Sequence, residues 1–403
     1  MRVAMLAPFA LHPKGTTRWR VMPLARALAA QGHQVRVVIP PYDWPGHSGR
    51  SWRDGGVDVV NLALPARRPA GLDHLALAAS MLLAALAWRP DVVHCFKPKG
   101  YGGLAAWMLA MRPGSAPLVV DADDWESGWN GPGRYPFWWR RVFAWQERWG
   151  LERAGAVTAA SRWLQGYAAA LRGDSGEVFF LPNGAEVATS RSQSAVSPES
   201  RCASGGNRPS QDRVLLYTRF VEHTPAHVWH VWQRILDREP GAVLLVAGRG
   251  EHGEEAGLAS LARSGGAGRS LRLLGWLPTA SRPGLFSGVD AAVLPVASTP
   301  RNRAKSPMRL VDLLAAGVPV AASAVGEYAG YVEHGVSGLL APSGDDGGLA
   351  DLVVRLLRDP CLGRRLGLAA AERIRTQYGW PRLAQAVLAA YEAVLATNRS
   401  AHE

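Results

Sequence analysis

The sequence contains little lysine, few cysteines and no long apolar run. Only four of its 45 basic residues are lysines, so arginine carries almost all of the net charge of +12. The accompanying abundance of alanine and glycine indicates that genomic composition contributes to this bias. A basic surface still favours phosphates, nucleic acid or anionic lipid as partners. The cysteines, Cys95, Cys202 and Cys361, are far apart and form no C-x-x-C pair, which argues against a disulfide framework and a zinc site.

The apolar segments are too short to span a membrane. The longest, from Leu75 to Trp88, falls below the roughly 20 residues that span a bilayer. The N-terminal run Met1–Phe9 is too short for a signal peptide and predicts a β-strand. With 48% hydrophobic and 19% charged residues, the 403-residue chain suits a globular protein of two or three domains. We therefore expect a protein of the reducing cytoplasm.

The chain opens with a strand, a loop, a helix and a second strand. Val3–Pro8 is the first strand, the loop contains Gly15 and Thr16, and a helix with an apolar face ends near Gly32 before the strand Val35–Ile39. Such a unit predicts a doubly wound parallel sheet, whose ligands bind at the carboxyl ends of the strands. Gly15 and Thr16 are at such an end and are candidate ligand-binding residues. A well-capped helix start is the alternative interpretation.

Further strands alternate with helical segments along the whole chain, as an α/β fold requires. A stretch rich in Ser, Gly, Arg and Pro interrupts this pattern and predicts a linker or insertion. We predict a first domain over 1–187, a linker over 188–212, a second domain over 213–380 and a last helix over 381–403 that crosses back to the first domain. The predicted strands are 91–94, 117–121, 156–160, 178–181, 213–220, 242–250, 271–276 and 290–295.

Residues 305–320 form the most informative stretch. Leu310, Leu313 and Leu314 share one helical face, Pro307 suits a first helical position, and Gly317 suits the helix end. The first turn of such a helix presents free backbone N–H groups to an anion. Lys305 and Arg309 add positive charge there, and Asp312 adds an acceptor for hydroxyl groups. These groups predict a site for a nucleotide diphosphate.

The same stretch resembles the donor-binding signature of family 4 of the GT-B glycosyltransferases, which use nucleotide-sugars and retain anomeric configuration. That signature is E-x7-E followed by A-x-A-x-G-x-P-V-V. When it is aligned on Gly317–Val320, its second acid falls at Asp312 and its first acid falls at Ala304. Because Ala304 has no carboxylate, sugar recognition must use other groups. A family variant with S-P-x-K also matches, with Arg309 at the lysine position. The resemblance implies donor binding by Ser306, Met308, Arg309, Leu310 and Asp312.

Other segments resemble the same family in the same order along most of the chain outside the linker. They include Gly15-Thr16 as a glycine loop, Leu181–Gly184, and Arg219 in place of a phosphate-binding arginine whose lysine partner is missing near Thr224. Gly248 and Trp276 follow two strands and are further donor-binding candidates. The resemblance implies a GT-B fold of two Rossmann-like domains facing across a cleft.

Acidic residues follow the strand 117–121. Asp121 and Asp123 form a D-x-D pair, which in other glycosyltransferases holds a divalent metal. Family 4 enzymes have a His-Asp pair near the sugar and acceptor here, with Asp123 at the histidine position. The resemblance therefore implies a catalytic role for Asp123 and acceptor binding by Asp124. A metal site and an unspecific acidic strand end are alternatives, and we expect activity without a metal or other cofactor.

The segment 137–149 is rich in tryptophan and arginine. Trp138, Trp139, Arg140 and Arg141 are not confined to one helical stripe, a composition typical of a membrane interface. We predict that these residues, with Arg148, contact an acceptor or an anionic membrane. A buried helix with arginines that reach solvent is the alternative. A nucleic-acid surface is not expected because no matching fold or repeat accompanies the segment.

Together these features predict a retaining glycosyltransferase that moves a sugar from a nucleotide-sugar to a sugar or lipid-linked acceptor, in the cytoplasm or on the inner face of its membrane. Two alternatives remain open: a catalytically inactive nucleotide-sugar-binding partner subunit and a nucleotide-sugar 2-epimerase. Catalysis would be electrostatic. The candidate catalytic residues are Arg219, Lys305, Arg309 and Asp123.

Overall fold

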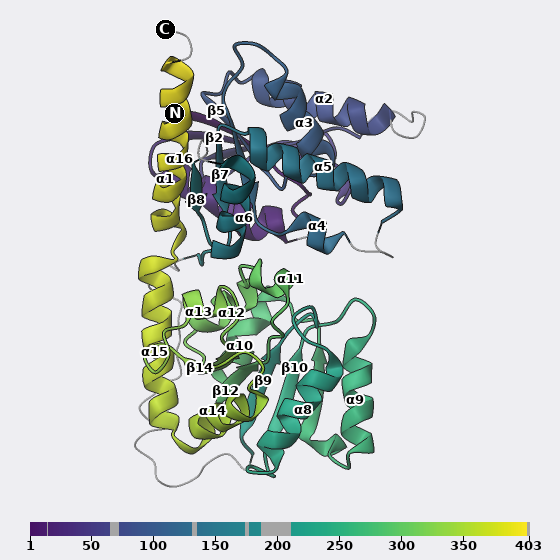
Figure 1. Cartoon of the computed structure of the whole chain (residues 1–403), viewed down its shortest axis with the longest axis vertical. Helices are drawn as coiled ribbons and strands as arrows, with labels where there is room; N and C mark the ends of the chain where they lie inside the picture. Colours follow the sequence, from purple (N-terminus) through teal and green to yellow (C-terminus); the bar gives the residue numbers. More distant parts are fainter. Residues whose placement is uncertain (14, 65–71, 131–134, 174–176, 187–210, 401–403) are drawn as a thin grey trace. The chain divides into compact units, whose positions relative to one another are not determined.

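The computed structural model describes residues 1–13, 15–64, 72–130, 135–173, 177–186 and 211–400 (Figure 1). It divides into two compact units. Unit 1 comprises Met1–Glu186, Ala304–Ser306 and Gly379–Glu403, and unit 2 comprises Val187–Arg303 and Pro307–Tyr378. Almost all of the predicted linker over 188–212 lies outside the described residues, as does Cys202.

Unit 1 is built on an eight-stranded sheet in the order β3-β4-β2-β1-β5-β6-β7-β8. All neighbouring strands are parallel except β3 and β4, which form an antiparallel hairpin at the edge. The sequence reasoning missed this hairpin. Its turn, Gly55-Gly56, has both glycines at positive φ and is a recognisable hairpin signal. The strands are β1 (Arg2–Leu6), β2 (Gln34–Ile39), β3 (Ser51–Asp54), β4 (Val57–Asn61), β5 (Val92–Phe96), β6 (Leu118–Ala122), β7 (Ala156–Ala159) and β8 (Val178–Phe180).

Helices cover both faces of this sheet because its strands are apolar on both sides. Along β1, Val3 and Met5 belong to a core shared with α1 and α16, whereas Ala4 and Leu6 belong to a core shared with α2, α3, α5 and α6 (Figure 1). The helical segments are a π-helical turn (Thr17–Val21), α1 (Met22–Ala30), a 3-10 turn (Pro45–His47), α2 (Leu72–Leu86), α3 (Gly100–Ala110), α4 (Glu126–Trp129), α5 (Phe137–Arg153), α6 (Arg162–Arg172) and α16 (Trp380–Ser400).

Unit 2 is built on a six-stranded sheet, entirely parallel in its described residues, in the order β11-β10-β9-β12-β13-β14. Its strands are β9 (Arg213–Tyr217), β10 (Val243–Ala247), β11 (Leu271–Gly275), β12 (Ala291–Leu294), β13 (Val320–Ser323) and β14 (Leu339–Ala341). Its helical segments are α8 (Pro225–Leu236), α9 (Glu254–Ser264), 3-10 turns at Gly268–Ser270 and Thr279–Ser281, α10 (Arg282–Ser287), α11 (Pro300–Arg303), α12 (Met308–Ala315), α13 (Tyr328–Tyr331), α14 (Asp346–Arg358) and α15 (Pro360–Gln377).

These two units confirm the predicted fold class, an α/β protein with two doubly wound, mainly parallel sheets. Each predicted strand is present within a few residues of its expected position. No helix in the described parts of the chain has both the length and the hydropathy of a membrane span. Cys95 and Cys361 are free thiols.

Candidate active site

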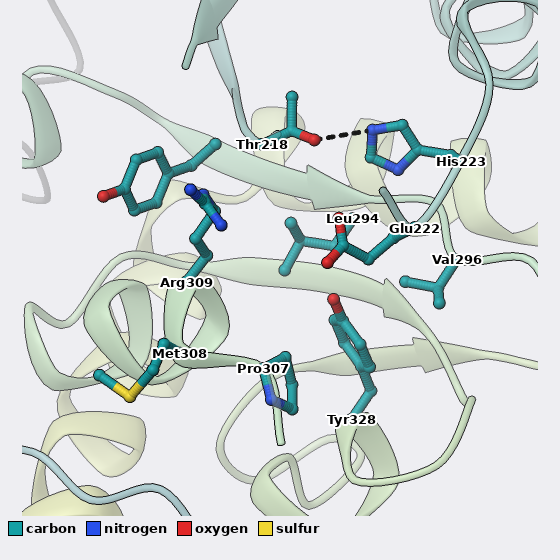
Figure 2. Close-up of a pocket in the computed structure, with 10 residues that line it drawn as sticks. Thr218, Glu222, His223, Leu294, Val296, Pro307, Met308, Arg309 and Tyr328 are labelled. Carbon is teal, nitrogen blue, oxygen red and sulfur yellow. Dashed lines mark hydrogen bonds between the residues drawn. The ribbon is translucent and has the colours of Figure 1, made fainter. Parts of the chain in front are cut away.

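A pocket opens in unit 2 where β9 ends and α12 begins (Figure 2). Its enclosed volume is about 30 Å³, which admits one end of a ligand rather than a whole nucleotide. The pocket lies at the carboxyl edge of a parallel sheet, where such folds bind their ligands. It is lined by Tyr217, Thr218, Glu222, His223, Leu294, Val296, Pro307, Met308, Arg309 and Tyr328.

Helix α12 directs Arg309 into this pocket. Leu310, Leu313 and Leu314 are fully buried, so the apolar face of the helix packs against the interior of unit 2. Gly317, at a φ of 72°, follows the helix in the left-handed conformation that glycine adopts without strain. Pro307 is the residue before the helix rather than its first member, which corrects the predicted start by one position. Met308 and Arg309 therefore occupy the first turn, beside unbonded backbone N–H groups.

Arg309 has the features of an anion-binding side chain. Its Nε is buried and has no hydrogen-bond partner among the residues that the structure describes. Its guanidinium carbon lies 5.3 Å from the ring centroid of Tyr217. Burial lowers the pKa of Arg309, and the charge of Glu222 acts in the opposite direction. A half-buried arginine whose Nε is buried and unused provides a site for a bidentate oxyanion such as a phosphate.

Asp312 lies one turn further along α12 and forms an ion pair with Arg282 at 3.0 Å. Burial raises the pKa of Asp312 to about 6, although the charges of Arg282 and Arg309 oppose the shift. The Tyr217 side chain also acts to lower the pKa of Asp312, so Asp312 lies close to the Tyr217 wall of the pocket. Sequence reasoning missed Arg282 because its contact with Asp312 joins two helices that are thirty residues apart.

The end of β9 is held in a fixed shape. The Thr218 hydroxyl lies 3.0 Å from His223 Nε2 and accepts from the Phe220 N–H at 2.7 Å, and His223 Nδ1 lies 2.8 Å from the Pro295 carbonyl (Figure 2). A carbonyl only accepts, so Nδ1 carries a proton and Nε2 of the neutral ring accepts from Thr218. Gly248 adjoins this end, and a Cβ there would lie 1.7 Å from the Thr218 carbonyl oxygen. Only glycine fits position 248 without a backbone shift.

Lys305 and Ser306 belong to unit 1 rather than to the pocket in unit 2. The Ser306 hydroxyl accepts from the backbone N–H of Asn183 at 2.8 Å, and the Ser306 carbonyl accepts from the Asn183 side chain at 2.8 Å. The Lys305 ammonium lies 4.9 Å from the centroid of the Trp129 ring. Ala304 is buried, and its carbonyl accepts from the Ser161 hydroxyl. Sequence reasoning grouped Lys305 with Arg309, whereas the structure assigns them to different units.

A buried ion pair lies at the carboxyl edge of the sheet in unit 1. Arg20 donates to both oxygens of Asp121 at 2.7 Å and to Asn183 at 3.0 Å. The Thr158 hydroxyl donates to Asp121 at 2.6 Å and lies 3.3 Å from His94 Nε2. Asp121 is therefore fully engaged with Arg20 and Thr158. The two acids of the D-x-D pair have different partners, which is not the arrangement of a shared metal ligand set.

Lys97 is the centre of an acidic cluster beside this ion pair. Its ammonium lies 3.2 Å from Asp123, 2.5 Å from Asp124 and 3.2 Å from Glu126. Burial acts to lower the pKa of Lys97, but the three carboxylates together outweigh burial and raise that pKa well above its usual value. Burial raises the pKa of Asp123 to about 7, against the charge of Lys97. Oxygens of the three acids lie within 4.8 Å of one another, a spacing that suits a metal ion, but Lys97 already supplies their positive charge.

The remaining donor candidates lie outside the pocket lining. Arg219 is 52% exposed and forms an ion pair with Glu251 at 3.1 Å. Trp276 is exposed directly after β11. Gly15 is exposed and Thr16 is half-buried at the start of the π-helical turn. The alternative interpretation, a helix start capped by Thr16, is not supported: within the described residues Thr16 makes no side-chain capping bond, and Thr17 donates to the Phe9 carbonyl at 2.6 Å.

Helix α5 has one buried face and one exposed face. Trp138 is 74% exposed, and Phe137, Val142 and Trp145 are exposed with it. Arg141 is exposed as well, whereas Trp139 and Arg140 are half-buried. The exposed side of α5 thus combines indole rings with positive charge. The buried side packs into unit 1 through Phe143, Gln146, Glu147, Gly150 and Leu151.

Two family models match the chain. Residues 15–184 match the model described as a glycosyl transferase 4-like domain, and residues 212–359 match the model described as glycosyl transferases group 1. The phosphatidyl-myo-inositol mannosyltransferase of Mycobacterium leprae is 27% identical over 406 residues, covering 98% of this chain and 97% of that protein.

Solved structures share the fold over nearly the whole chain. Sucrose-phosphate synthase from Thermosynechococcus elongatus has a TM-score of 0.75 at 19% identity, covering 98% of this chain and 99% of that chain. Anabaena HepE in complex with UDP-glucose has a TM-score of 0.63 at 19% identity, covering 99% and 100% of the two chains. At these identities the likeness concerns the fold, and it agrees with the two sheets described above.

Proposed function

Because the chain belongs to the glycosyltransferases with a GT-B fold, we propose that it transfers a sugar from a nucleotide-diphosphate sugar to an acceptor hydroxyl with retention of anomeric configuration. The observation that carries the proposal is the pocket at the start of α12, where Arg309 has a buried, unused donor atom. Asp312, about one turn away, offers a carboxylate to the ribose hydroxyls. The HepE structure in complex with UDP-glucose supports a donor of this class.

The chemistry proposed for this pocket is electrostatic. As the bond between the sugar and the diphosphate breaks, negative charge grows on the departing diphosphate and positive charge grows on the sugar. Arg309 and the amides of the first turn of α12 are positioned to stabilise the departing charge, with Arg219 of the same unit as a further cation. A diphosphate oxygen then takes the proton of the acceptor hydroxyl, which attacks the face that the diphosphate leaves.

We propose that this reaction needs no metal ion. The strongest acidic cluster in the described residues, formed by Asp123, Asp124 and Glu126, already has Lys97 as its counter-ion. A divalent ion at that place would meet a buried ammonium and be repelled by it. In this proposal Asp123 and Asp124 contact the acceptor instead.

We further propose that the acceptor is lipid-linked or held at an anionic membrane surface. The exposed side of α5, with Trp138, Trp145 and Arg141, supports this proposal because indoles favour the headgroup boundary and arginine binds lipid phosphate. The mycobacterial relative is named as a mannosyltransferase that acts on a phosphatidyl-inositol. Such an acceptor places the protein at the cytoplasmic face of a membrane.

A thermal-shift screen with UDP, GDP and their sugars tests donor binding, and a turnover assay with the stabilising nucleotide-sugar tests the reaction. We expect Arg309→Ala to weaken donor binding by about 10- to 100-fold, since a charge-assisted contact contributes roughly 1.5–3 kcal/mol. Arg355→Ala, an exposed change on α14, is the matched control.

The products separate the proposal from its alternatives. Nucleotide release that depends on an added acceptor supports the transferase. Binding without turnover under every acceptor condition supports an inactive partner subunit, and an isomerised sugar supports an epimerase. A protein that binds neither nucleotide contradicts the donor site itself.

A further inference from the structure

The pocket contains an acidic side chain that the family signature does not include. The signature acid expected to face the donor sugar is replaced by Ala304, whose side chain has no hydrogen-bonding group and is buried in unit 1. Among the described residues that line the pocket, Glu222 is the only acid. It comes from a different segment, the loop after β9, so the signature does not reveal it.

The backbone holds Glu222 firmly at this place. Its carbonyl accepts from the side-chain amide of Asn302 at 2.9 Å and from the backbone N–H of Ala297 at 3.2 Å. Asn302 is buried and also donates to the Ala297 carbonyl at 2.8 Å, which ties the two loops together. The next residue, His223, bonds to Pro295 and Thr218 as described above. These contacts fix the backbone from which the Glu222 side chain extends into the pocket.

The Glu222 side chain points into the pocket between the Arg309 guanidinium and the Tyr328 hydroxyl (Figure 2). Its charge acts on both neighbours. It opposes the lowering of the Arg309 pKa, and, after burial, it is the next cause of the raised pKa of Tyr328.

In the pocket, Glu222 and Tyr328 lie on one side of Arg309 (Figure 2), whereas Asp312 lies outside the lining, one turn further along α12. A nucleotide-sugar has the order ribose, diphosphate and sugar. With Asp312 on the ribose and Arg309 on the diphosphate, the group beyond Arg309 meets the sugar ring. Sugar hydroxyls donate hydrogen bonds to a carboxylate, and a phenol such as Tyr328 offers a second partner.

We infer that Glu222 accepts hydrogen bonds from hydroxyl groups of the donor sugar and determines which sugar the enzyme accepts. This inference rests on the proposed function, since it requires a nucleotide-sugar in the pocket. It also accounts for the alanine at position 304, because the missing carboxylate is supplied from the loop after β9. A site built to receive hydroxyls discriminates strongly against an analogue that lacks one.

The test compares the affinity for a nucleotide-sugar with the affinity for the bare nucleotide by titration calorimetry. UDP is paired with UDP-glucose and GDP with GDP-mannose, and the pair that binds the unmodified protein is used. Glu222→Gln keeps the size of the side chain and removes its charge. Glu239→Gln, which alters an acid paired with Arg358 at the surface of unit 2, is the matched control.

We expect Glu222→Gln to lower the affinity for the nucleotide-sugar about 10-fold or more relative to the bare nucleotide, because a charge-assisted hydrogen bond is lost. Glu239→Gln should leave that ratio unchanged. If Glu222 serves only as the counter-ion of Arg309, Glu222→Gln strengthens binding of both ligands equally, and the inference is wrong. If the unmodified protein binds neither pair, the proposed function fails instead, so the two failures are distinguishable.

Discussion

The buried carboxylate of Asp312 is expected to reduce the stability of the protein at neutral pH, although it is the proposed acceptor for the ribose hydroxyls. Burial raises its pKa from 3.8 to about 6, so the folded protein keeps a proton that the unfolded chain has already lost between these values. Stability therefore falls as the pH rises through this window. At neutral pH the charged carboxylate costs at most about 3 kcal/mol relative to its protonated form.

Asp312→Asn replaces this carboxylate with a neutral group of the same shape. At about pH 7.5 we expect the variant to melt roughly 6–12 °C above the unmodified protein, the shift that about 3 kcal/mol produces in a unit of this size. Near pH 4, where the native carboxyl group is protonated, the two melting temperatures should agree. Asp351→Asn, a change at an exposed partner of Arg238, should shift neither value.

The same variant should bind its nucleotide-sugar less tightly and lose the pH dependence of binding. In the unmodified protein we expect affinity to fall as the pH drops through about 6, because a protonated carboxyl is a weaker acceptor for ribose hydroxyls. The Michaelis constant for the donor should rise more than turnover falls, since a ribose contact is the same in ground and transition states. A variant that melts no higher at pH 7.5, or that binds the donor unchanged, would refute this reasoning.

Three further outcomes are expected. Gly248→Ala should lower the free energy of unfolding of unit 2 by about 3 kcal/mol or more in urea, because its Cβ would overlap the Thr218 carbonyl. An unchanged free energy of unfolding would show that the backbone at the end of β9 shifts without cost. Activity should persist in EDTA, whereas loss with EDTA and recovery with Mn²⁺ would contradict a metal-free reaction. Sedimentation with anionic vesicles should be weak, should decline as salt rises, and should be reduced by Trp138→Ala with Arg141→Glu; no binding at low salt would favour an acceptor in solution.

Features that depend on local sequence were predictable. The strands, the helix α12 and the glycine that follows it are set by apolar periodicity and backbone conformation over a few neighbouring residues. Arg309 and Asp312 could be named as candidate site residues because they lie within one continuous motif. The hairpin β3–β4 had a readable glycine turn and was overlooked.

Features that depend on distant contacts were not predictable from the sequence. Arg282 forms an ion pair with Asp312 of another helix, and the backbone of Glu222 is held by Asn302 from another segment. Lys97 pairs with acids that follow the neighbouring strand. Nothing in the residues around Lys97 indicates its role, which arises only when parallel strands bring their carboxyl ends together. Which charges surround a buried group depends on the topology of the fold, and a single sequence does not show which distant residues that topology brings together.

The assignment of α16 to unit 1 has a consequence for synthesis on the ribosome. Trp380, Leu383, Val387 and Tyr391 complete the core on one face of the N-terminal sheet, and Tyr391 bonds to His94 at 2.9 Å. The strands of that sheet emerge first, and at roughly 5–20 residues per second the last helix follows about 10–40 s later. Throughout that interval the part of this face that α16 covers stays exposed, although α1 already packs on the rest. We therefore expect chaperone dependence during translation, and expect chains that stop at Tyr378 to be captured by chaperones or to aggregate.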